Sequence, residues 1–201
     1  MLPTQAGPLS GDHDRLRIVV GAGAVLVVRP VAATVVLPGD RRTRLDLDVE
    51  LGRGGRLVLE EAPLIVAAGA DVERSTTVRL AAGAAAALRD VVVLGRSGES
   101  GGRLSSLLRV IDEQGVLLHD ALRLDPATAR SDGHVALAPG HRAAGTLCLL
   151  GASTPPPFAL ARGGGLRRAS APDVAQLDAE LADAWAAWSE SVIAPARIRE
   201  L

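Results

Sequence analysis

The sequence predicts a mainly β protein in which stacked β-hairpins or β-arches form a sandwich- or solenoid-like body, followed by one C-terminal α-helix. Three features predict this class: a glycine-centred repeat of about thirty residues, apolar residues at every second position around those glycines, and a single stretch with helical spacing. We expect one domain over residues 1–201, made of a β body at 13–150, a Pro- and Gly-rich loop at 151–171 and a helix at 172–194.

The repeat is visible when three copies are aligned on Gly23, Gly54 and Gly83. Aliphatic residues then occupy the same places, three and five residues before each glycine and five residues after it. Copy by copy, these places hold Val20, Leu51 and Leu80; Ile18, Val49 and Val78; and Val28, Leu59 and Leu88. Such alternation on both sides of a glycine turn predicts two strands per copy. A weaker copy around Gly115 carries one extra residue in its turn.

The second copy indicates which face of its first strand meets water. Between Arg44 and Leu51, charged residues alternate with aliphatic ones without interruption. A strand with one charged and one aliphatic face is typical of a sheet that is wet on one side. Because such a unit cannot bury its apolar face alone, we expect successive copies to stack on one another.

The composition changes after Leu150. Proline and glycine clusters at 153–157 and 163–165 predict a loop. From Pro172 to Pro195, apolar residues recur at steps of three and four, which predicts an amphipathic helix. Its stripe consists of Val174, Leu177, Leu181, Trp185, Trp188 and Val192. The stripe either packs against the β body or anchors a partner protein, and Trp185 and Trp188 are the candidate partner-binding residues.

Composition and charge exclude several classes of function. All 22 basic residues are arginine, which excludes lysine chemistry, and the net charge of −1 offers no basic surface to nucleic acid or an anionic membrane. The single cysteine, Cys148, excludes an internal disulfide and a cysteine-rich metal site. The longest apolar run, Ile18 to Val28, is roughly half the length of a membrane helix. We expect a soluble, cytoplasmic protein that keeps an uncovered apolar patch and needs a partner for good solubility.

A series of short motifs follows in one order through most of residues 5–126. They are Gly7-Pro-Leu-Ser-Gly-Asp12, Val31-Ala-Ala-Thr34, Pro63-Leu-Ile65, Leu94-Gly-Arg-Ser-Gly-Glu99 and the segment from Leu117 to Pro126. Taken in this order, they resemble the urease accessory protein UreD (UreH) family. The motif residues that carry the resemblance are Gly7, Gly11, Asp12, Thr34, Pro63, Gly95, Arg96 and Glu99.

The resemblance implies a urease maturation scaffold, or chaperone, that is not an enzyme. It implies that the chain binds apo-urease together with a UreF-type adaptor and a UreG-type GTPase, and helps to insert nickel into the urease active site. It also implies no cofactor of the chain's own, only nickel in transit. An ion that has to leave again favours oxygen ligands over thiolates. Glu61, Asp90 and Glu99 are therefore the candidate residues of a transient nickel path.

Two other classes of function stay open. A stacked-β hydrolase acting on polysaccharide would draw its carboxylates from Glu60, Glu61 and Asp90. The predicted β body contains no tyrosine or tryptophan on which a sugar could stack, which argues against this class. A purely structural β module would instead assemble with copies of itself.

Overall fold

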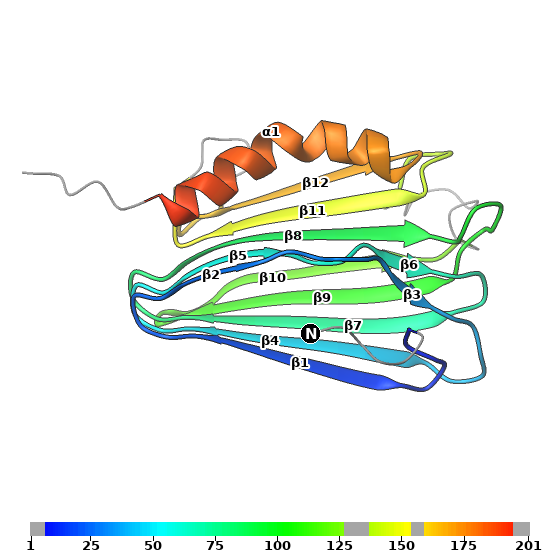
Figure 1. Ribbon diagram of the computed structural model, residues 1–201, viewed down its shortest axis with the longest axis horizontal. Coiled ribbons are helices and arrows are strands. Elements are labelled where there is room, and N and C mark those ends of the chain that lie inside the picture. The colour runs from blue at the N-terminus through cyan, green and yellow to red at the C-terminus, as the bar shows by residue number, and fades with distance from the viewer. Residues whose placement is uncertain (1–6, 127–136, 154–158, 195–201) are drawn as a thin grey trace, which may run out of the picture.

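The computed structural model describes residues 7–126, 137–153 and 159–194, which form two β-sheets and one helix packed on the outside of the second sheet (Figure 1). The first sheet contains, in spatial order, β1 (His13–Val20), β4 (Thr43–Leu51), β7 (Asp71–Leu80), β9 (Arg103–Asp112) and β10 (Gly115–Leu124). The second contains β12 (Gly165–Ala171), β11 (Ala143–Leu150), β8 (Ala85–Leu94), β5 (Arg56–Glu60) and β2 (Val25–Val28), with β6 (Leu64–Val66) beside β8 and β3 (Thr34–Val36) beside β6. The helix is α1 (Val174–Ile193).

The first three glycine turns each carry the chain from the first sheet to the second, so each copy is a β-arch rather than a hairpin. The strands β1, β4 and β7 pair in parallel, and so do β2, β5 and β8. The predicted alignment is also the structural register, because Val20 pairs with Leu51 and Leu51 with Leu80. The prediction of a mainly β, stacked, solenoid-like body is confirmed.

The copy around Gly115 is a hairpin. The strands β9 and β10 pair antiparallel within the first sheet, and their register shifts between Val116 and Leu118. This shift accommodates the extra residue that the sequence indicates, as a β-bulge does. The parallel stack ends here, because β11 pairs antiparallel with both β8 and β12.

Aliphatic side chains form a core on each side of the second sheet. Between the sheets, Val49 and Val78 belong to a buried cluster built from the inward faces of successive arches. On the other side, Leu147 of β11 packs in a second cluster with Leu177 and Leu181 of α1. All five side chains are fully buried, so apolar burial is the main force that holds the layers together.

The expected loop at 151–171 is wrong over its last part. From Gly165 the chain forms β12, which pairs antiparallel with β11. The sequence does not predict this strand, because the adjacent charged residues Arg167 and Arg168 interrupt the alternation of apolar and polar residues. In the structure their side chains point to opposite faces of the sheet. Arg167 donates to the Glu180 carbonyl on the helix side, at 3.2 Å, whereas Arg168 points toward the first sheet and stays partly exposed. Residues 154–158 lie outside the described residues.

The C-terminal helix is confirmed. Its N-cap is Asp173, whose carboxylate accepts a hydrogen bond from the backbone N–H of Gln176 at 2.9 Å. The last helical residue is Ile193, and Pro195 lies outside the described residues. Across the described parts of the chain, no helix combines the length and apolar character that crossing a membrane requires.

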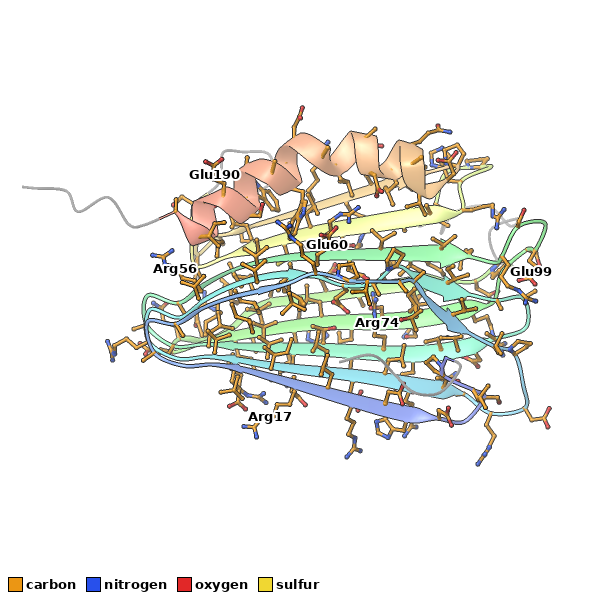
Figure 2. All side chains as sticks on the ribbon, viewed as in Figure 1. Arg17, Arg56, Glu60, Arg74, Glu99 and Glu190 are labelled. Carbon is orange, nitrogen blue, oxygen red and sulfur yellow. The ribbon has the colours of Figure 1, made fainter. Side chains whose placement is uncertain are left out.

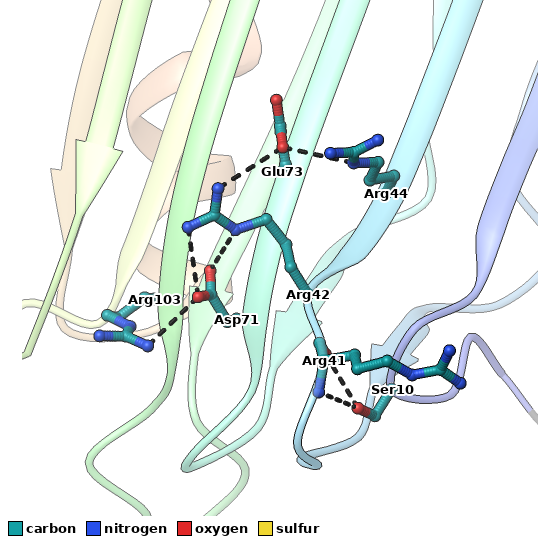
Figure 3. Close-up of polar contacts among 7 residues, drawn as sticks. All are labelled: Ser10, Arg41, Arg42, Arg44, Asp71, Glu73 and Arg103. Carbon is teal, nitrogen blue, oxygen red and sulfur yellow. Dashed lines mark hydrogen bonds and ion pairs between the residues drawn. The ribbon is translucent and has the colours of Figure 1, made fainter.

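The outer face of the first sheet is charged, as the alternation within β4 predicts. Figure 3 shows ion pairs running across neighbouring strands and the turns before them. Arg42 and Arg103 both contact Asp71, at 3.1 and 3.2 Å, and Glu73 lies 3.5 Å from Arg44. Exposed pairs of this kind contribute about 0–1 kcal/mol each. The stability of the sheet therefore rests on its inward face.

Candidate functional site

A small polar cavity lies between the two sheets, within a core that is otherwise aliphatic. Its volume is about 40 Å³, enough for a few water molecules. The charged groups that line it are the carboxylates of Glu61, Asp90 and Asp120 and the guanidinium groups of Arg74 and Arg168. The hydroxyls of Thr76, Ser106 and Thr146 and the thiol of Cys148 also line it. Charged groups from both sheets therefore converge in this cavity.

Arg74 of β7 organises one side of this cavity (Figure 2). It is only 7% exposed, donates two hydrogen bonds to Asp90 of β8, one of them 2.6 Å long, and bonds to the Ser106 hydroxyl at 3.1 Å. Burial acts to lower the pKa of Arg74, but the charges of Asp90 and Glu61 outweigh it and leave that pKa raised. The guanidinium therefore stays charged and neutralises Asp90 in a bidentate pair.

A second ion pair joins the same two sheets. Arg168 of β12 donates to the carboxylate of Asp120 of β10 at 2.5 Å, and its Nε contacts the Thr146 hydroxyl at 3.3 Å. Each pair therefore takes one residue from each sheet. Two carboxylates of the cavity are matched in this way by two guanidinium groups.

Glu61 is the third carboxylate, and among the described residues it has no ion-pair partner of its own. Burial raises the pKa of Glu61 from 4.5 to about 7; the nearby charge of Arg74 opposes this rise and that of Asp90 adds to it. Near neutral pH, Glu61 therefore exchanges a proton readily. With both ion pairs intact, the cavity carries no net charge when Glu61 is protonated and one negative charge when it is ionised.

Cys148 faces the same cavity but is held as a neutral thiol. Burial, together with the nearby Asp120 charge, raises the pKa of the Cys148 thiol to about 12. Because the thiolate and not the thiol binds metal ions, this side chain behaves as a small apolar group at neutral pH. Oxygen atoms are therefore the metal ligands that the cavity offers.

The structure brings together two of the three predicted nickel-path residues. Glu61 and Asp90 share the cavity, but Glu99 does not line it. Glu99 lies in the turn after β8, where its carboxylate accepts hydrogen bonds from the N–H groups of Ala68 and Arg96, at 3.1 and 3.0 Å, and from the Arg96 guanidinium at 2.7 Å (Figure 2). These bonds lower the pKa of Glu99 to about 2. Its contacts are those of a residue that fixes a turn.

Arg74, Asp120 and Arg168 complete the cavity and were not predicted from the sequence. A signal existed for Arg74, because it occupies an apolar position in the alternation of β7, between Val72 and Thr76. No such signal marks Arg168, whose strand was expected to be a loop. Within the described residues, no group of three or more histidine, cysteine, aspartate or glutamate side chains is placed to hold a metal ion together.

Most motif residues shape turns and coil ends. Thr34 begins β3 by donating its N–H to the Pro63 carbonyl at 2.9 Å, and Gly95 donates to the Val66 carbonyl at 2.8 Å. Asp12 accepts from the N–H of Leu9 at 2.8 Å. Gly7 and Gly11 both have positive φ. Because these contacts are internal, the motif residues hold the turns and strand ends that connect successive arches.

The helix stripe packs on the β body. Trp188 is 7% exposed and belongs to the buried cluster under α1, and Trp185 packs against that cluster with partial exposure. Burial leaves little of Trp188 on the surface that a partner could reach. A partner-binding role for Trp188, like that for Trp185, stays a prediction.

The carboxylates of the hydrolase alternative do not form a catalytic pair. Glu60 points to the helix side of the second sheet, where Arg89 binds it and also reaches Asp178 of α1 at 2.5 Å (Figure 2). Glu61 points into the cavity on the opposite side. Asp90 is held by Arg74. An acid and a base facing each other across an open cleft are therefore not formed by these residues.

Comparison with known proteins gives a consistent result. A family model described as "UreD urease accessory protein" matches residues 1–200. Among curated proteins, the chain is 53% identical over 107 residues to urease accessory protein UreD of Frankia alni, an alignment that covers 52% of this chain and 36% of the relative. It is 39% identical to UreD of a Parafrankia species (74% of this chain, 57% of the relative) and 42% identical to UreD of Streptomyces coelicolor (79% and 64%). The matches thus span between about a third and two thirds of these relatives' length.

Proposed function

Because this chain belongs to the UreD family of urease accessory proteins, we propose that it is a non-catalytic scaffold in urease maturation. It binds apo-urease together with a UreF-type adaptor and a UreG-type GTPase, and it helps nickel to reach the urease active site. Family membership across residues 1–200 supports this role. The internal ion pairs of the cavity, which tie up most of its carboxylates, favour a scaffold over a hydrolase.

We further propose that the cavity takes up nickel in transit. The observation that carries this step is Glu61, an interior carboxylate without an ion pair whose pKa lies near 7. A nickel ion that approaches Glu61 displaces its proton and gains one carboxylate ligand. The hydroxyls of Ser106 and Thr146 and water molecules supply further oxygen contacts.

The surrounding charges keep this binding weak. Asp90 is engaged by Arg74 and Asp120 by Arg168, so a nickel ion meets one free negative charge and two neighbouring guanidinium groups. Without thiolate ligands or a closed carboxylate cage, the ion can leave in the direction of a stronger site. A transfer protein requires this property, whereas a storage site does not.

The scaffold role is tested by co-expressing the chain with urease subunits and the other accessory proteins. Deleting the chain should leave urease assembled but poor in nickel, as measured by elemental analysis of purified urease. Tagged chain should co-purify with apo-urease and with the adaptor. Normal nickel content of urease in the deletion strain would contradict the proposed function.

The route through the cavity is tested with Glu61→Gln, which keeps shape and removes the titrating carboxylate. We expect lower nickel content of urease with unchanged co-purification of partners. Glu73→Gln is the matched control, because Glu73 lies on the outer face of the first sheet. Equal nickel loading by both variants would exclude the route through Glu61 while leaving the scaffold role intact.

A further inference from the structure

Among the described residues, no strand lies on the outer side of the first arch of the stack, which consists of β1 and β2. Each of these strands is the last one of its sheet, and the successive arches follow in the same order in both sheets. Most of the large, exposed apolar side chains in the described chain belong to this arch and the loop after it. They are Leu16, Val19, Val25, Leu26, Val27 and Val31.

On the inward rows of the two strands, the equivalent positions are buried one arch further along. Leu16 is 58% exposed, but its register partner Leu47 is 7% exposed. Leu26 is 37% exposed, whereas its partner Leu57 is fully buried. The difference arises because β4 and β5 have strands on both sides and β1 and β2 have strands on one. An additional arch in the same register would cover Leu16 and Leu26 in the same way.

The backbone N–H and C=O groups on the free side of β1 are placed to pair with another parallel strand. Val20 accepts at its carbonyl from the N–H of Gly52, at 2.8 Å, so even-numbered residues of β1 bond to β4. In a parallel ladder the odd-numbered residues then direct their N–H and C=O groups to the free side. The turns form a ladder as well, since Gly23 donates to the Arg53 carbonyl and Gly54 to the Ala82 carbonyl, at 2.9 and 3.0 Å.

The charges on the outer face of β1 indicate which kind of strand could pair with its free edge. The outer row of β1 is basic, with Arg15 and Arg17 at side-chain exposures of 74% and 66%. The outer row of the neighbouring strand β4 is acidic. Glu50 of this row lies 3.0 Å from Arg17. Asp46 lies 3.7 Å from Arg15. The free side of β1 therefore favours another strand whose outer row is acidic.

A second copy of the chain does not meet this requirement. A two-fold axis would place β1 antiparallel to itself. When residues 13–19 of the two strands pair with their outer rows on the same face, Arg15 lies opposite Arg17 of the copy, and like charges directly opposite are destabilising. We propose that β1 and β2 are the docking surface for a strand–turn–strand segment of another polypeptide, with aliphatic inward residues and an acidic outer row on its first strand. The segment extends the parallel stack by one arch.

The probe for this surface is a synthetic peptide of residues 43–60, the chain's own acidic arch, labelled with a fluorophore. We expect saturable binding to the full chain by anisotropy, with one peptide per chain and weaker binding at higher salt. Reversing Asp46, Asp48 and Glu50 to arginine in the peptide should weaken binding at least about tenfold. Hydrogen exchange should slow at residues 13–28 when peptide is bound.

Two chain variants locate the binding. Leu16→Lys places a charge on the inward row of the edge strand β1 and should abolish peptide binding, while Val116→Lys, at an exposed position of β10, should leave it unchanged. Circular dichroism verifies that both variants fold. No saturation below about 1 mM, equal loss in both variants, or a homodimer that Leu16→Lys dissociates and the peptide does not would each overturn the proposal.

Discussion

Arg74 and Asp90 form a bidentate ion pair across the interior between the two sheets. Arg74 has almost no exposed surface and Asp90 has little, so neither charge can be satisfied by solvent if the other is removed. The pair therefore ties the position of β7 to that of β8 through charge as well as through apolar contact.

The first prediction follows from this pair. Arg74→Leu should lower the free energy of unfolding by about 3–5 kcal/mol, because it leaves Asp90 buried without a counter-charge. Urea denaturation measures the loss. In the double variant Arg74→Leu, Asp90→Leu most of the loss should be recovered. The control is Arg42→Leu, which breaks an exposed pair with Asp71 and should cost less than about 1 kcal/mol. Equal losses for the two single variants would contradict the role of burial.

The register of the arches could be predicted because every copy repeats the same aliphatic positions relative to its glycine. Val20, Leu51 and Leu80 form one row in the sheet as they do in the aligned sequence. Whether a turn crosses between sheets or folds back could not be predicted, since Gly54 and Gly115 both follow alternating strands. Whether the turn forms an arch or a hairpin depends on which strands its two arms pack against. Those contacts join residues that are far apart in the chain.

The candidate site was predictable only in part for a related reason. Glu61 and Asp90 could be selected because carboxylates supply the oxygen ligands that an ion in transit favours. Their surroundings could not, because Arg168 reaches Asp120 across 48 positions of sequence. Glu99 looked equivalent to Glu61 in the sequence, but its carboxylate accepts hydrogen bonds from the N–H groups of Arg96 in its own turn and of the distant Ala68. The distinction between a turn-forming carboxylate and a cavity carboxylate exists only in three dimensions.

The second prediction concerns the pH dependence of stability at Glu61. Its pKa is about 7 in the folded chain against 4.5 for the unperturbed group, so between these values the folded state binds the extra proton. Stability contributed by neutral Glu61 is therefore fully present below pH 4.5 and is lost as the pH rises through 7. Glu61→Gln keeps the side chain neutral at every pH. Its stability relative to the wild type should increase by on the order of 1–3 kcal/mol from pH 4.5 to 8, measured by denaturation at each pH.

A difference between Glu61→Gln and the wild type that stays constant over this pH range would show that Glu61 is solvated like a surface carboxylate. Glu73→Gln is again the reference, because Glu73 is exposed on the outer face. The comparison separates the titration of the cavity from changes in net charge.

The third prediction uses two glycines with similar backbone conformations. Gly151 and Gly98 have φ values of 66° and 79°, so alanine is strained at both. An added Cβ at Gly151 would lie 1.9 Å from the Ala84 carbonyl oxygen, whereas at Gly98 it would meet nothing within 4 Å. Gly98→Ala should cost about 1–2 kcal/mol from strain alone. Gly151→Ala should cost roughly 1–3 kcal/mol more, because backbone has to move. Thermal unfolding of the two variants measures the difference, and equal melting temperatures would refute the predicted clash.

The last prediction tests how α1 sits on the second sheet. Gly145 of β11 lies under the helix, and a Cβ added there would be 2.5 Å from Cδ1 of Leu181. Gly145→Ala alone should therefore destabilise by about 1–3 kcal/mol through overpacking, and Leu181→Ala alone by about 2–5 kcal/mol through the cavity that it leaves. Because the new methyl group occupies part of that cavity, the double variant should be more stable than the sum of the two losses by about 0.5–3 kcal/mol. Urea denaturation of the wild type, the two single variants and the double variant completes this double-mutant cycle. Additive losses would mean that α1 does not rest on β11 through this contact.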